Sequence, residues 1–174
     1  MSNERTNPDT LNTGDFYKPA LPSGLNVLTI LTFIGSGIQL LFTITGFISA
    51  KKNFEERDKV MAQMNSAEMP GWLKSMMPNM DNYEEVVTKS FENRIPIFVL
   101  SVVALSLCIY GAMQMRKLKK QGFTFYLIGQ LLPFVSSVLF IGFMAFEGIF
   151  VGIIIGITFL FILLYAMNRK HLIY

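Results

Sequence analysis

The chain has 174 residues, 52% of them hydrophobic, and a mean hydropathy of +0.44. It is too apolar for a soluble domain and too short for two membrane domains, so the composition predicts one compact membrane bundle. The net charge of +3 is small, and four basic residues sit in one short loop, 116–120, which indicates membrane topology and argues against nucleic acid as a partner. A single cysteine, Cys108, excludes an intramolecular disulfide and a thiolate metal site.

Residues 1–24 form the first predicted element, a disordered N-terminal tail. They are rich in Asn, Thr, Asp, Pro and Gly and show no helical period. No apolar segment directly follows the first charged residues, so we expect the first membrane span to act as an uncleaved signal. The rest of the chain, 25–174, is predicted to form the membrane domain.

Four stretches of the membrane domain lack Asp, Glu, Lys, Arg and His altogether: 25–50, 95–113, 125–146 and 149–167. Each approaches or exceeds the ~20 residues that a helix needs to cross a bilayer. The predicted fold class is therefore an all-α membrane protein with a bundle of four transmembrane helices. Because no ionisable group lies inside a span, we expect no enzyme and no cofactor.

The segment 51–94 joins the first two spans and is the one large extramembrane element. Its ends, 51–66 and 81–94, have helical patterns, and they rise roughly 24 Å and roughly 21 Å at about 1.5 Å per residue. These similar lengths predict an antiparallel helical hairpin that protrudes from the bundle. The hairpin either stands erect or bends at Lys51-Lys52 and lies in the headgroup layer.

The tip of this hairpin carries an apolar face with helical spacing. Its members are Trp72, Leu73, Met76, Met77 and Met80. Apolar patches held in water usually mark binding surfaces, so we expect this face to contact a partner, with Trp72 as its anchor. Folding back onto the arms and insertion among lipid headgroups are the other arrangements open to it.

Methionine is concentrated in the same region, where residues 61–80 hold six of the 11 methionines. Thioether sulfur suits Cu(I), so a copper-handling membrane protein is one alternative. Methionine also fills irregular apolar surfaces, and the single histidine, His171, lies at the far end of the chain. We therefore assign no metal ligands.

Polar and small residues inside the spans predict helix contacts. Most hydroxyls and amides there are expected to hydrogen-bond between helices, but Gln39 and Gln130 are costly to expose to lipid and are candidates for a polar path. Such a path would belong to a small transporter or channel subunit. Small residues make three flat grooves, at Gly46 in the first span, at Ala104, Cys108 and Ala112 in the second, and at Gly152 and Gly156 in the fourth. The sequence leaves open whether these grooves pack inside the bundle or between protomers.

The orientation follows from basic residues near the span ends. The N-tail, the 116–120 loop and the C-tail share one side, whereas the turn at Glu147-Gly148 has no basic residue. The seven basic residues of 51–94 oppose this assignment, but short loops carry more weight. We expect both termini in the cytoplasm.

Three stretches resemble a group of small four-span bacterial inner-membrane proteins of unknown function. They read LPSGLNVLTILTFIGSGIQLL, GAMQMRKLKKQGFTFYLIGQLL and FILLYAMNRKHL. The resemblance implies a bacterial inner membrane and carries no activity or functional residue. The unpaired apolar tip leads us to expect an accessory or interaction subunit that contacts a larger membrane complex through 51–94. The expected partners are lipid and other membrane proteins or a second copy of the chain.

Overall fold

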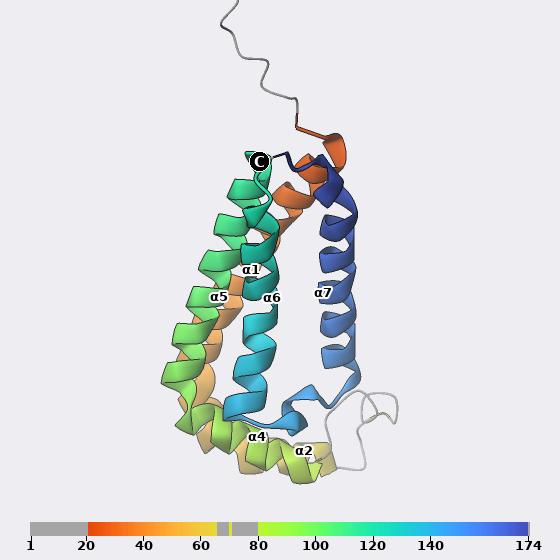
Figure 1. The fold of residues 1–174 in the computed structure, drawn as a ribbon. Helices are drawn as coiled ribbons and strands as arrows, with labels where there is room; N and C mark the ends of the chain where they lie inside the picture. The colour runs from red at the N-terminus through yellow and green to blue at the C-terminus, as the bar shows by residue number, and fades with distance from the viewer. Residues whose placement is uncertain (1–20, 66–69, 71–79, 174) are drawn as a thin grey trace, which may run out of the picture.

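The computed structural model describes residues 21–65, 70 and 80–173, and in this part of the chain it contains α-helices and short 3₁₀ helices without strands. Four helices are long and apolar enough to cross a membrane (Figure 1): α1 (Ser23–Glu55), α5 (Arg94–Arg116), α6 (Gln121–Phe140) and α7 (Ile149–Asn168). The predicted all-α fold is confirmed, and the chain is a multi-pass membrane protein. The first helix begins at the same end of the bundle as the C-terminus.

The first span is longer than its apolar stretch because its last turns are supported by charge pairs. Lys51 lies 3.7 Å from Glu55 and Lys52 lies 4.0 Å from Glu56, both at the i, i+4 spacing that stabilises a helix surface. The helix therefore continues to Glu55 before the chain turns.

The third span ends earlier than predicted. Its apolar stretch runs to residue 146, but α6 ends at Phe140, and the 3₁₀ helix η2 (Phe143–Phe146) follows it. Gly142 and Gly148 have φ angles of 104° and 99°, which a glycine adopts without steric cost and which stop a right-handed helix. The link to α7 is thus residues 141–148, and the expected two-residue turn at 147–148 is wrong.

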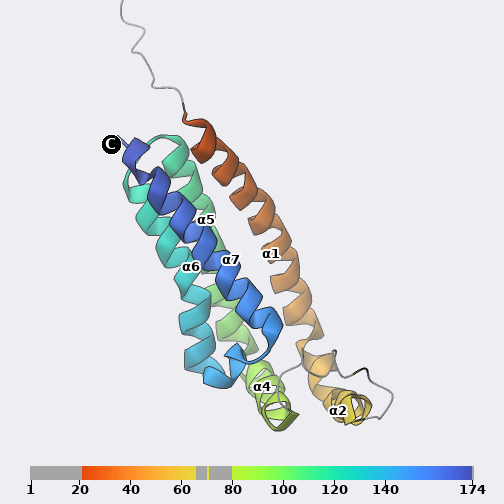
Figure 2. The same ribbon diagram turned by 90° about the vertical axis from the view of Figure 1, so that its right-hand side faces the viewer.

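The segment after α1 forms the two helical arms of the predicted hairpin, α2 (Arg57–Asn65) and α4 (Met80–Glu92). Phe54 in the last turn of α1 stacks on Phe91 of α4 with ring centroids 4.7 Å apart, and Arg57 of α2 lies 3.8 Å from Glu84 of α4. Both arms run across the end of the bundle rather than along its axis (Figures 1 and 2). The arms therefore do not stand erect, and the chain bends at Glu56 rather than at Lys51-Lys52. The placement of the hairpin in the headgroup layer stays a prediction.

Two side-chain hydrogen bonds hold α4 and its junction with α5 against the bundle end. Asn82 Nδ2 donates to Glu147 Oε1 at 2.7 Å, and Asn93 Nδ2 donates to the carbonyl of Phe140 at 3.3 Å. Both acceptors belong to the end of α6 or to the link that follows it. The hairpin is therefore docked onto the α6–α7 connection.

Helices α5 and α6 make the closest contact in the bundle, because glycines let their backbones touch. A Cβ atom built on Gly111 would lie 2.6 Å from the backbone nitrogen of Tyr126, and one on Gly122 would lie 2.6 Å from the nitrogen of Met115. One on Gly129 would lie 2.7 Å from the carbonyl oxygen of Ala104. No side chain fits at these positions without moving a helix.

Helix α7 is the least covered span. Among its residues Ile149–Asn168, Tyr165 is the buried one, and the N-terminal half of the helix is largely exposed. The buried cluster that includes Leu25, Met115, Tyr126 and Tyr165 joins all four spans near the end where α1 begins and α7 ends. The bundle is therefore packed tightly at that end and held more loosely along α7.

Candidate functional site

A cavity of about 160 Å³ lies between α1, α6 and α7, inside the apolar spans. Polar side chains contribute much of its lining: Thr32, Ser36, Gln39, Tyr126, Gln130 and Thr158. The two glutamines singled out from the sequence thus line one space, although they come from different helices. Such a lining is unusual for a lipid-facing surface and offers hydrogen-bond donors and acceptors to a small polar molecule or to water.

Two tyrosines form hydrogen bonds with side chains that line this polar cavity. The hydroxyls of Thr32 and Tyr165 are 2.7 Å apart and share a hydrogen bond between α1 and α7, and Gln130 Nε2 donates to the hydroxyl of Tyr126 at 3.0 Å. The rings of Tyr126 and Tyr165 have centroids 4.4 Å apart. Neither tyrosine was identified from the sequence, although a tyrosine inside a span indicates a buried hydroxyl that needs a hydrogen-bond partner.

The small-residue groove of the second span is filled within the chain. Ala104, Cys108 and Ala112 are 1%, 4% and 0% exposed, and they face α6. Gly129 of α6 meets Ala104 and Cys108 of α5, and Gly122 of α6 meets Gly111 and Met115 of α5; neither α6 glycine was identified as a packing residue from the sequence. Their spacing of seven residues, one heptad along a helix, is a signal that could have found them.

The small residues of the first and fourth spans are placed differently. A Cβ atom built on Gly46, Gly152 or Gly156 would have no other part of the described chain within 4 Å. Gly46 lines a second space, a groove between α1, α4 and α5. Gly152 and Gly156 lie on the exposed surface of α7.

The predicted tip contacts, Trp72, Leu73, Met76 and Met77, lie outside the described residues, and Met80 is placed only as the first residue of α4. Three of the six methionines behind the copper alternative, Met69, Met76 and Met77, lie there as well. In the described ranges no group of three or more His, Cys, Asp or Glu side chains could hold a metal ion. The partner contact of the tip therefore stays a prediction.

The four apolar helices define the class, an integral membrane protein with several spans. The chain matches no protein family, no curated protein and no solved structure. The resemblance to small bacterial inner-membrane proteins and the cytoplasmic placement of both termini likewise stay predictions.

Proposed function

We propose that the protein is a non-enzymatic accessory subunit that associates with other transmembrane helices in a bacterial inner-membrane complex. The observation that supports this proposal most is the open face of α7. Gly152 and Gly156 lie one turn apart there, and no other part of the described chain approaches either of them.

The packing of α5 on α6 shows how this chain uses small residues elsewhere. Gly111, Gly122 and Gly129 are each met by the backbone or by Cys108 of the opposite helix. Close backbone approach of this kind gives transmembrane helices their van der Waals contact, since lipid offers no hydrophobic driving force between them. A helix of another subunit, seated on Gly152 and Gly156, would supply the contact that α7 lacks within the chain.

The test is the mass of the complex after extraction in a mild detergent. The double variant Gly152→Ile, Gly156→Ile places bulk on the open face, where a Cβ atom at either position meets no other part of the described chain within 4 Å. We expect the folded protein to accumulate normally and the complex to shrink to the single chain. Gly37→Ile is the matched control, since Gly37 is equally open but has Phe33 and Leu41 four residues away. An unchanged complex in the double variant, or equal loss in the control, refutes the proposal.

The hairpin tip is the second proposed contact. Trp72→Ala with Met76→Ser should abolish recovery of the partner while the amount of membrane protein stays constant. If this variant still recovers every partner, the tip makes no partner contact and the association rests on α7 alone. If the variant instead loses Cu(I) binding, the tip is a copper site and the copper alternative applies.

A second candidate function, passage or binding of a small polar solute, rests on the cavity that Gln39 and Gln130 line together. In proteoliposomes, Gln39→Leu and Gln130→Leu should each abolish solute flux. Gln114→Leu is the matched control, because Gln114 bonds to Tyr110 and lies outside the cavity. Absence of flux in the unmodified protein, or equal loss in the control, rules this function out.

A further inference from the structure

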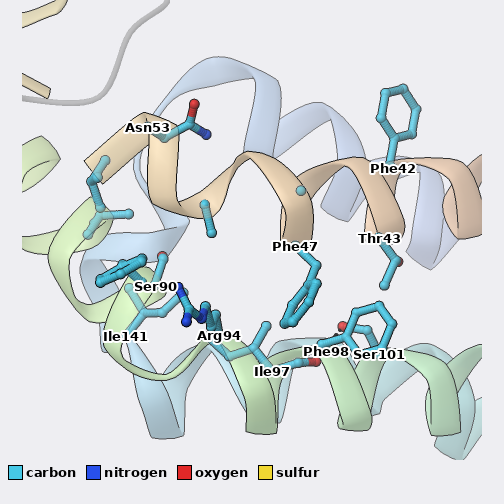
Figure 3. Close-up of a pocket in the computed structure, with 15 residues that line it drawn as sticks. Phe42, Thr43, Phe47, Asn53, Ser90, Arg94, Ile97, Phe98, Ser101 and Ile141 are labelled. Atoms are coloured by element: carbon cyan, nitrogen blue, oxygen red, sulfur yellow. Dashed lines mark hydrogen bonds between the residues drawn. The ribbon is translucent and has the colours of Figure 1, made fainter. Parts of the chain in front are cut away.

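A groove of about 340 Å³ lies where the hairpin meets the bundle, between α1, α4 and α5 (Figure 3). Its volume is at the lower end of the range of about 300–1,000 Å³ that ligand pockets occupy. Aromatic rings form much of the wall, and the rings of Phe47 and Phe98 have centroids 4.7 Å apart. Gly46 opens onto the same space, and a Cβ atom built there would meet nothing within 4 Å. The groove therefore has space for a ligand next to Gly46, along a wall of aromatic side chains.

The polar groups of the groove differ between its two ends. At one end, the hydroxyls of Thr43 and Ser101 donate to carbonyls of their own helices at 2.9 Å and 2.8 Å, so their bonding is satisfied. At the hairpin end lie Ser90 and Arg94, whose side chains make no hydrogen bond or ion pair with the described residues (Figure 3). The groove thus has the polarity of an amphiphile, apolar along its length with free donors at one end.

The guanidinium of Arg94 is an uncompensated positive charge. It lies over the ring of Phe91, 4.6 Å from the centroid, and no Asp or Glu lines the groove. Four of the other basic residues described in this segment, Lys51, Lys52, Arg57 and Lys89, each have a carboxylate within 4.0 Å, whereas Lys59 forms no ion pair with the described residues. Arg94 is also the first residue of α5, directly before the uncharged stretch that starts at residue 95. Its charge therefore lies at the edge of the hydrocarbon region, where lipid headgroups are found.

We propose that this groove binds an anionic phospholipid from the surrounding bilayer. The headgroup phosphate accepts hydrogen bonds from Arg94 and Ser90, and one acyl chain lies along Phe47 and Phe98. A guanidinium presents paired donors that match the geometry of a phosphate, and an acyl chain restores the dispersion contacts that an empty apolar groove lacks. An anionic lipid is favoured over a zwitterionic one because its headgroup carries no amine that would face Arg94.

The test uses native mass spectrometry of the delipidated full chain, titrated with phosphatidylglycerol and, separately, with phosphatidylcholine. We expect the unmodified protein to prefer the anionic lipid, and Arg94→Gln to lower its affinity for that lipid about fivefold, the effect of one basic residue near a lipid surface. Arg116→Gln is the matched control, because it removes the same charge from the opposite end of the same helix. Equal affinity of the unmodified protein for the two lipids, or an equal loss in the control, overturns the proposal.

A second variant tests the acyl-chain part of the groove independently of Arg94. Gly46→Leu should place bulk in the groove next to Phe47, since a Cβ atom at this position meets no other part of the described chain within 4 Å, and it should lower the affinity for both lipids. Gly37→Leu makes the same change on α1 outside the groove and should leave lipid binding intact. Unchanged lipid affinity in Gly46→Leu overturns the proposal. The proposal is also overturned if the unmodified protein is a dimer that Gly46→Leu dissociates, because a second copy of the chain would then occupy the groove.

Discussion

The contact between α5 and α6 should be the part of the bundle most sensitive to a single added methyl group. Gly111→Ala would place a Cβ atom 2.6 Å from the backbone nitrogen of Tyr126 and 2.7 Å from the carbonyl oxygen of Gly122. Both atoms belong to the backbone, so no side-chain rotation relieves the contact. The two helices must separate for the methyl group to fit.

The size of the effect follows from these distances. Non-bonded atoms prefer separations of about 3.5–4.0 Å, so the helices must move apart by roughly 1 Å at this point. Overpacking of this kind costs about 1–3 kcal/mol in the free energy of unfolding. Gly37→Ala is the matched control, because its Cβ atom would meet nothing within 4 Å and should instead stabilise its helix by about 0.5–1 kcal/mol.

The thiol of Cys108 provides the assay. It is 4% exposed, it is the single cysteine of the chain, and its Sγ lies 4.0 Å from the carbonyl oxygen of Tyr126 across the same contact. Alkylation of this thiol during a titration with denaturing detergent therefore reports the opening of α5 from α6. We expect Gly111→Ala to expose the thiol at a lower detergent fraction than the unmodified protein, and Gly37→Ala to leave it protected. Equal protection in the two variants would refute close backbone packing at this site.

Three further predictions concern the other contacts and the orientation. Tyr165→Phe leaves the buried hydroxyl of Thr32 without its partner and should lower the free energy of unfolding by about 0.6–2 kcal/mol, measured by the same titration, and adding Thr32→Val should restore part of the loss. Asn82→Ala removes the bond between α4 and the α6–α7 link, so limited proteolysis should cut the hairpin faster while the spans stay intact. In a background without the native cysteine, a membrane-impermeant thiol reagent applied to intact cells should label Ser75→Cys and spare Lys117→Cys. The opposite labelling would reverse the orientation.

The four spans could be predicted from the sequence because lipid imposes a local requirement. Every backbone group in the hydrocarbon region must be bonded inside its own helix, and nearly every side chain there must be apolar, so a long run without charge identifies a span by itself. The helical arms of the hairpin were equally predictable from their own patterns. The end of α6 was not, because the positive φ angles at Gly142 and Gly148 stop the helix inside an apolar stretch and hydropathy carries no information about backbone angles.

The partner of each helix face depended on the tertiary structure. The spacing of Ala104, Cys108 and Ala112 showed that a flat face exists in the second span, as the spacing of Gly152 and Gly156 did in the fourth, but the first is filled by α6 and the second is open. Helical periodicity sets which residues share a face, whereas the rotation and axial position of each helix result from all of its neighbours packing at once. For the same reason only the tertiary structure brought Gln39 and Gln130 to one cavity and left Arg94 uncompensated at the end of an apolar groove.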